Sequence, residues 1–389
     1  DNTAVGHSAG DANTTGSDNT AIGDNALGAN TTAANNTAVG SSALAANTTG
    51  EKNVAVGGYA LAAATTADQT VCIGYNAGGA ITTADFNTAI GFQALKTATT
   101  GQRNTVVGHE AGEAITTGSY NIAMGMAAME ATTTGGNNIA IGYSAMNVNT
   151  VGADNTAVGH SCMGALTSAS HNSALGYGSL DAATTGHSNV AVGKDSAGAI
   201  NTGFKNTMIG FAAGDTTTTG DYNIVIGSEA DVSGTGTENE IVIGQSATGK
   251  GSNTAFLSPS GGGNEVYNTN NTTAWNQTSD RRIKKNIVDN KKGLEIINKV
   301  RIRNFDYRTE DEIVDFENPK SAVVNREGIQ LGTIAQELEE FLPEVVRTGS
   351  TGVKSVDAEN FTWYLINAVQ ELSAEVEQLK QQAHEKCDK

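Results

Sequence analysis

The sequence has little of what a thick hydrophobic core needs. Among 389 residues there are only 3 prolines and 2 tryptophans, aromatics make up 5%, and glycine supplies 47 residues. Large side chains for burial are therefore scarce, which argues against ordinary globular domains for most of the chain. Thin repeat architectures bury small side chains against neighbouring coils and tolerate such a composition.

The cysteines are few, odd in number and far apart, so they predict neither a disulfide framework nor a metal site. They are Cys72, Cys162 and Cys387. The first two replace small apolar residues of a repeat, which favours a role as buried filler. The six histidines lie outside any metal-ligand spacing, and we expect them at the surface. We therefore expect no metal and no cofactor.

Long apolar runs and basic charge are also missing from most of the chain. No run approaches the roughly 20 residues that span a bilayer, so we expect no membrane insertion. The first 250 residues carry 6 Lys and Arg against 19 Asp and Glu. This acidic balance argues against nucleic acid and anionic membranes as partners. Because Asp1 opens in mid-repeat, we expect the native chain to begin earlier.

What the chain does have is a period of 17 residues. Around each repeat glycine stands a version of Asn-Thr-Ala-Val-Gly, as at 36–40, and Ala-Leu or Ala-Gly follows shortly afterwards. Fifteen copies without insertion or deletion predict a solenoid or stacked fibre over residues 1–250. The repeat glycines are Gly6, Gly23, Gly40, Gly57, Gly74, Gly91, Gly108, Gly125, Gly142, Gly159, Gly176, Gly193, Gly210, Gly227 and Gly244.

Each repeat divides into two parts. The Thr-Ala-(Val/Ile)-Gly segment is apolar and β-branched, which predicts a short strand. Its glycine marks a corner or a close backbone approach, and the Asn four residues earlier suits a turn. The Ala-rich remainder, such as 42–46, fits either one helical turn or a second strand.

Stacking is expected to bury one apolar ladder, while a second lines the coil interior or faces partner chains. The first ladder is Val5, Ile22, Val39, Val56, Ile73 and their equivalents. The second is Leu27, Leu44, Leu61, Leu95, Met129, Met146 and Leu180. Because one thin coil buries little, we expect three chains to associate.

The pattern stops after Gly244. Residues 251–278 are interpreted as a junction, and a second domain is predicted for residues 279–389, where basic residues become frequent. That domain reads as mixed α/β. Helices are predicted at 292–300 and 335–340, and strands at 303–307 and 329–334.

The C-terminus predicts a long helix with a coiled-coil seam over about 361–383. Its apolar residues step by 4, 3, 4 and 3: Leu365, Val369, Leu372, Val376 and Leu379. Such a short seam needs support from the rest of an oligomer.

Two resemblances follow from these motifs. The repeats resemble those of phage tail fibres and, more loosely, the head repeats of trimeric bacterial adhesins. The run 278–287, Thr-Ser-Asp-Arg-Arg-Ile-Lys-Lys-Asn-Ile, resembles the start of the intramolecular chaperone domain of phage tail spikes and fibres, endosialidases among them. Further matches are 332–337, 342–344 and 368–372. In that family the domain guides trimer assembly and then releases itself, which implies a Ser–Lys dyad at Ser279 and Lys284 and cleavage between Thr278 and Ser279.

This chemistry is consistent with the residues themselves. A serine hydroxyl becomes a good nucleophile when a base takes its proton, and lysine is such a base only in its neutral form. Nearby cations, Arg281, Arg282 and Lys285, favour that form. Five residues apart, Ser279 and Lys284 meet only across a turn or from different chains. Glu337 and Gln336 either assist this site or act in capping and on the helix surface.

The sequence thus predicts a mainly β protein: a trimeric β-solenoid or fibre shaft, then a small α/β chaperone domain ending in a coiled coil. As a function we expect a viral tail fibre for host attachment, located in the virion and made in the host bacterial cytoplasm. Its partners would be two further copies and a cell-surface receptor, a glycan or outer-membrane component. Its enzymatic activity would be self-cleavage alone. The alternatives are a bacterial surface adhesin and a glycan-degrading tailspike.

Overall fold

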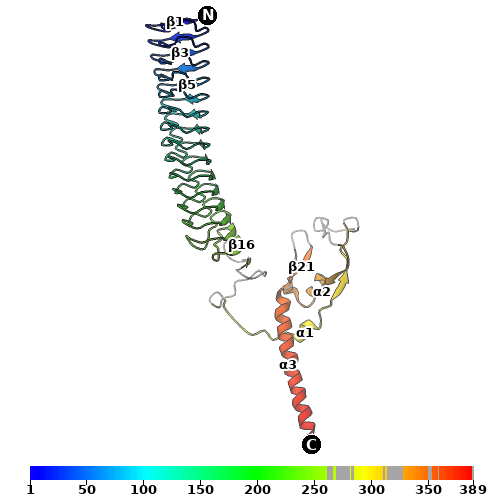
Figure 1. Cartoon of the computed structure of the whole chain (residues 1–389). Coiled ribbons are helices and arrows are strands. Elements are labelled where there is room, and N and C mark those ends of the chain that lie inside the picture. The colour runs from blue at the N-terminus through cyan, green and yellow to red at the C-terminus, as the bar shows by residue number, and fades with distance from the viewer. Residues whose placement is uncertain are drawn as a thin grey trace. The chain divides into compact units, whose positions relative to one another are not determined.

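The computed structural model describes residues 1–260, 266–268, 281, 284–309, 312, 327–348, 353–357 and 359–387. The chain forms two compact units, Asp1–Thr278 and Ser279–Lys389. The first is a column of stacked coils and the second is a small α/β unit with a long terminal helix (Figure 1). The predicted fold class, a β-solenoid followed by a small α/β unit with a C-terminal helix, is confirmed.

One short strand per repeat builds the shaft. Consecutive strands β1 to β16 pair in parallel, and β17 returns antiparallel. From β1 to β15 the partners stand 17 residues apart, as for Ala38 and Ala55, and β15 and β16 pair at a spacing of 14, as for Ile241 and Ala255. The strands are β1 Thr3–Val5, β2 Thr20–Ile22, β3 Thr37–Val39, β4 Val54–Val56, β5 Val71–Ile73, β6 Thr88–Ile90, β7 Thr105–Val107, β8 Ile122–Met124, β9 Ile139–Ile141, β10 Thr156–Val158, β11 Ser173–Leu175, β12 Val190–Val192, β13 Thr207–Ile209, β14 Ile224–Ile226, β15 Ile241–Gln245, β16 Ala255–Ser260 and β17 Val266–Asn268.

The Ala-rich part of each repeat is neither a helical turn nor a second strand. It is a chain of turns in which alternate residues are left-handed, as Ser42 (φ 54°) and Leu44 (φ 51°). Some of its backbone groups bond the next coil: the Leu44 N–H donates to the Ala60 carbonyl at 2.9 Å. Others close turns within the coil, as where the Ala43 N–H donates to the Gly40 carbonyl at 3.2 Å. These hydrogen bonds give the backbone N–H and carbonyl groups the partners that they would otherwise have within a helix or a sheet.

The expected burial of the Val and Ile ladder is wrong for the single chain. Val5, Ile22 and Ile73 are 58%, 39% and 37% exposed, and Val39 is half-buried. A three-residue strand turns only its middle residue inward because side chains alternate, so Ala38 and its equivalents are buried instead. The larger side chains flank it on the outer face.

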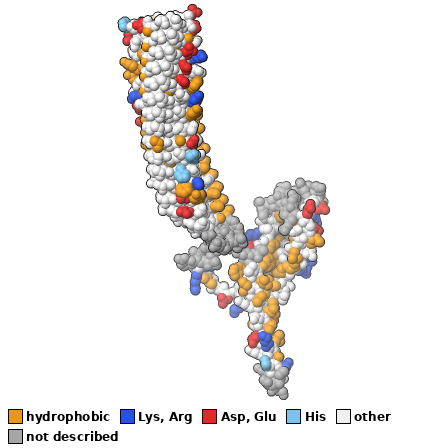
Figure 2. Space-filling model, viewed as in Figure 1, with side chains coloured by type: hydrophobic (Ala, Val, Ile, Leu, Met, Phe, Trp, Pro, Cys, Tyr) orange, Lys and Arg blue, Asp and Glu red, His pale blue; other side chains and the backbone are white. Residues whose placement is uncertain are grey.

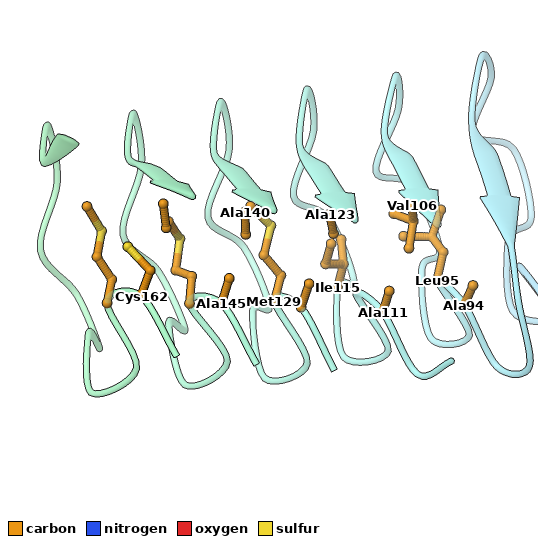
Figure 3. Packing of buried hydrophobic residues seen from close by; sticks show 14 of the residues in the cluster. Ala94, Leu95, Val106, Ala111, Ile115, Ala123, Met129, Ala140, Ala145 and Cys162 are labelled. Carbon is orange, nitrogen blue, oxygen red and sulfur yellow. The ribbon is translucent and has the colours of Figure 1, made fainter. Parts of the chain in front are cut away.

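The Leu and Met ladder fills the coil interior from the side opposite the strand. Of the two predicted positions for this ladder, the coil interior or a surface that faces partner chains, the interior is therefore the one observed. All seven of its named members are fully buried. Figure 3 shows Leu95, Ile115 and Met129 facing the strand residues Val106 and Ala123 across the coil.

Large and small side chains compensate within each coil. Where the ladder position is Leu95, the residue three further on is Ala98 and the strand supplies alanine. Where the ladder position is Gly112, Ile115 and Val106 fill the space, and a Cβ on Gly112 would lie 2.9 Å from Ile115 Cδ1. In these two coils a large side chain at one position thus goes with a small one at the other, as close packing requires.

A buried ladder of asparagines also runs through the shaft. Asn138 donates from Nδ2 to the Gly152 carbonyl at 2.9 Å, and its Oδ1 accepts the Asn155 N–H at 3.0 Å. The asparagine therefore links neighbouring coils as well as its own turn. At the last coil Glu240 takes this position, and its carboxylate accepts from the N–H groups of Ser233 and Gly251.

Two of the predicted filler residues are confirmed as such. Cys72 and Cys162 are free and buried, and burial raises the pKa of each thiol to about 12. Both thiols are therefore protonated and unreactive. Cys387 lies in the terminal helix, and its side chain is outside the described residues.

The second unit contains the predicted short elements and one long helix. α1 precedes a two-stranded sheet, α2 and a 3₁₀ turn follow it, and a hairpin leads to α3. Among the described residues, none of the helices has the length and hydropathy to cross a membrane. The bounds are α1 Leu294–Ile297, β18 Arg303–Phe305, β19 Gln330–Gly332, α2 Ala335–Glu339, the 3₁₀ turn Pro343–Val345, β20 Val346–Thr348, β21 Lys354–Val356 and α3 Glu359–Cys387.

Candidate functional site

The predicted dyad lies at the start of the second unit. Lys284 is exposed in an irregular segment, where its N–H donates to the Arg281 carbonyl at 3.2 Å. Thr278 and Ser279 lie outside the described residues, so the proximity of Ser279 to Lys284 stays a prediction. Asn286, two residues after the lysine, is left-handed (φ 55°). The chain thus bends just after Lys284, outside the 279–284 segment for which the turn is predicted.

Just downstream, the chain is anchored to α3. The Asn367 side chain donates to the Asn290 carbonyl at 2.9 Å, and the Leu294 N–H donates to Glu371 Oε2 at 2.7 Å. Between them Gly293 comes so close that a Cβ there would lie 2.4 Å from the Ala368 nitrogen. Residues 290–294, a few residues after Lys284, are therefore held by the helix that carries the predicted coiled coil.

Glu337 serves as an ion-pair partner on α2. Its carboxylate accepts from Arg303 Nη2 at 2.7 Å and from Nε at 3.3 Å. The hydrogen bond and charge of Arg303 hold the pKa of Glu337 below its usual range. This pair ties α2 to β18 at the surface. Of the two roles expected for Glu337, the helix-surface role is the one the contacts support.

The Leu342-Pro343-Glu344 run packs into the same unit. Leu342 is buried with Ile296, Leu338, Val345 and Tyr364. The Tyr364 hydroxyl donates to Glu344 Oε1 at 2.9 Å. Burial, and then this bond, raise the pKa of Tyr364. Three of the four motifs of the resemblance, at 332–337, 342–344 and 368–372, thus belong to one folded unit around α1 and α3.

Helix α3 has two apolar faces with different surroundings. Tyr364 and Ala368 are buried against the unit's own core. The five predicted seam residues, Leu365, Val369, Leu372, Val376 and Leu379, are 42–63% exposed. The seam is therefore uncovered in one chain, and the coiled coil stays a prediction that needs further copies.

A cluster of carboxylates on the shaft was missed by the sequence analysis. Ligand atoms of Glu110, Glu113 and Glu130 lie within 4.8 Å of one another, half-buried, and Glu113 pairs with Lys96 at 2.8 Å. Lys96, Glu113 and Glu130 stand 17 residues apart, so reading the repeats column by column would have found them. Exposed acidic clusters of this kind are common without a ligand.

One comparison with known proteins gives a match, and it lies in the second unit. Residues 279–347 match the family model described as the chaperone of endosialidase. Neither a curated protein nor a solved structure matches the chain. The matched segment includes Ser279, Lys284, Glu337 and the 342–344 run. Together with the solenoid, the match supports a tail-fibre or tailspike-like protein with a trimerisation chaperone, as the sequence resemblance implied.

Proposed function

We propose that this chain is the distal part of a viral tail fibre that attaches to a host-cell receptor, and that its C-terminal domain assembles three copies and then cuts itself off before Ser279. One observation carries the proposal: the segment that matches the chaperone family is anchored to a helix whose apolar seam is uncovered. A helix with a second, unpartnered apolar face requires further chains to bury it. The shaft supplies the extended structure that such a fibre needs, with a glycan or outer-membrane component as its target.

Assembly is tested first at the seam of α3. In the full chain, Leu372→Asp with Val376→Asp places charge in the three-chain seam, which is costly without a partner. We expect native mass measurements to show loss of most soluble trimer, at least about tenfold, since two buried carboxylates exceed the 1.4 kcal/mol of one decade.

The matched control adds the same charge beside the seam. Ser373 and Gln378 are exposed positions on α3, so Ser373→Asp with Gln378→Asp leaves the seam intact. The control is expected to keep the wild-type trimer yield. Equal yields from both variants would show that the helix does not drive assembly.

Self-cleavage would proceed by transfer of the Thr278 acyl group from the Ser279 nitrogen to the Ser279 Oγ, followed by hydrolysis. Lys284 takes the Ser279 hydroxyl proton, and Oγ attacks the Thr278 carbonyl carbon. The Thr278–Ser279 C–N bond breaks, and the freed amine takes up the proton. Water then hydrolyses the ester, releasing the Thr278 carboxylate and restoring the serine hydroxyl. Because folding must first bring Ser279 and Lys284 together, we expect cleavage to follow trimer formation and to serve as a check on completed assembly.

Denaturing mass analysis of purified trimer tests this step. Wild type should yield a fragment of residues 279–389, while Ser279→Ala and Lys284→Ala should yield only the intact chain. Both variants should still form trimers, because assembly depends on the fold of the domain. Lys291→Ala, at an exposed lysine with no assigned role in the site, is the control, with cleavage retained. A folded wild-type trimer that stays intact on long incubation would refute self-cleavage and leave the chaperone role untouched.

A further inference from the structure

The outward face of the shaft's sheet carries no charge along its whole length, and one of its two rows is apolar throughout. Each strand from β1 to β15 turns its first and third residues outward, and in none of the fifteen is either residue charged. The third position is always Val, Ile, Leu or Met, and the first is Thr, Ser, Val or Ile. We call these two rows the outer apolar face. Figure 2 shows hydrophobic side chains gathered along one edge of the lower shaft, beside a mostly polar surface.

This face is exposed in the single chain despite its composition. Ile90, Ile141 and Ile209 are 36%, 38% and 37% exposed, and Leu175 is 52% exposed. With strands about 4.8 Å apart, fifteen of them make a strip about 70 Å long. At a width of about 10 Å it offers on the order of 700 Å² per chain, close to one partner's share of a standard protein interface.

A third row widens the face with aromatic side chains. In β15 the strand continues past its glycine, and Gln245 points outward beside Ile243. The same position holds exposed aromatic side chains in five earlier coils, Tyr75, Phe92, Tyr143, Tyr177 and Phe211, and it holds the charged residues Asp24 and Lys194 in two others. The rings stack along the column: the Tyr75 and Phe92 centroids are 5.7 Å apart at 15°. Since neighbours occupy the ring faces, this row presents ring edges and suits close packing better than sugar stacking.

We propose that the outer apolar face is covered by the same face of two further copies of this chain, aligned in register around an axis parallel to the shaft. This rests on the proposed trimer and states which surface of the shaft forms it. Another copy offers two charge-free rows with the same 17-residue period over fifteen coils. In register, every row meets its equivalent at the same height, as cyclic symmetry requires.

Charge and the terminal helix favour the same arrangement. The chain carries a net charge of −18, so copies repel one another over most of their surface, and the outer apolar face avoids that repulsion. α3 leaves its own apolar seam uncovered, so both units present an unpartnered apolar strip. A single threefold assembly would cover both.

Cross-linking in the full chain tests the proposal. Ile141→Cys places a thiol on the outer apolar face, and Thr134→Cys places one on the exposed segment between β8 and β9. Both carry Cys387→Ser, and the buried Cys72 and Cys162 stay as they are. With a short bismaleimide reagent, Ile141→Cys should give covalently joined chains in at least tenfold excess over Thr134→Cys.

Native mass is measured on the same samples, so a failure of the proposed trimer can be distinguished from a failure of the proposed interface. Single chains in wild type would overturn the trimer and with it the proposed assembly function. Trimers in which Ile141→Cys is labelled by a single maleimide but never cross-linked would overturn the outer apolar face as the interface and leave the trimer standing. Equal cross-linking of both variants would also overturn it, because chance collisions would then explain the products.

Discussion

Gly125→Ala is expected to weaken the shaft by about 3 kcal/mol or more, which is large for one methyl group. The added Cβ would lie 2.5 Å from the carbonyl oxygen of Gly142 and 2.7 Å from its carbon, both of them backbone atoms of the next coil. The φ of 131° adds strain for any residue with a Cβ. Hydrogen exchange should show faster opening of the coils around β8 and β9, because each coil contacts only its neighbours.

A variant at Gly251 distinguishes the effect of the steric clash from the effect of the backbone strain. Its φ is 124°, close to that of Gly125, but an added Cβ would meet nothing within 4 Å. Gly251→Ala is therefore expected to show the strain alone, with a loss of about 1–2 kcal/mol. Equal losses in the two variants would mean that close stacking of coils is not what fixes the 17-residue glycine.

The period was predictable from the sequence because it is enforced at every coil by the same contacts. An insertion at any coil would break the register between strands such as β3 and β4, where Ala38 faces Ala55. Fifteen glycines in step are therefore direct evidence of stacking. The position of the strand was predictable because the Thr-Ala-(Val/Ile)-Gly segment is apolar and β-branched, whereas the sequence left open whether the Ala-rich remainder forms a helical turn or a second strand.

The faces of the strand were not predictable from hydrophobicity alone. Val39 is the larger residue and Ala38 the smaller, yet Ala38 faces the core. The coil interior is narrow, and Leu44 already fills it from the other side. The sequence indicates that two positions share one volume only when both are compared across repeats. Leu95 stands with Ala98 in one repeat, and Gly112 stands with Ile115 in the next. That signal was present in the sequence and required knowing which residues face each other.

The site was only partly predictable. The basic run, the 342–344 run and the terminal helix indicated the chaperone domain, whose family match is confirmed for residues 279–347. The Arg303–Glu337 pair and the bond between Leu294 and Glu371 were not foreseen, since they join residues 34 and 77 positions apart. Periodicity carries no information on such distant contacts.

Asn138→Ala is expected to destabilise the middle of the shaft by about 2–3 kcal/mol. The side chain is fully buried, and its Oδ1 accepts both the backbone N–H and the Nδ2 of Asn155, at 3.0 and 3.2 Å. Alanine leaves that backbone N–H without an acceptor in a dry interior, which costs more than the bond itself gains. The Gly152 carbonyl keeps the Asn149 amide at 3.0 Å, so the loss centres on Asn155. Hydrogen exchange at the Asn155 amide reports it directly.

Asn138→Thr is the control that the shaft itself suggests. At the equivalent position Thr70 accepts the Asn87 N–H and donates to the Ala84 carbonyl, each at 3.4 Å. A threonine at 138 can therefore supply the missing acceptor through a longer bond, and we expect it to recover about half of the loss. If Thr and Ala at 138 protect the Asn155 amide equally poorly, acceptor loss is not the cause. If neither variant changes exchange, the asparagine ladder does not hold the coils together.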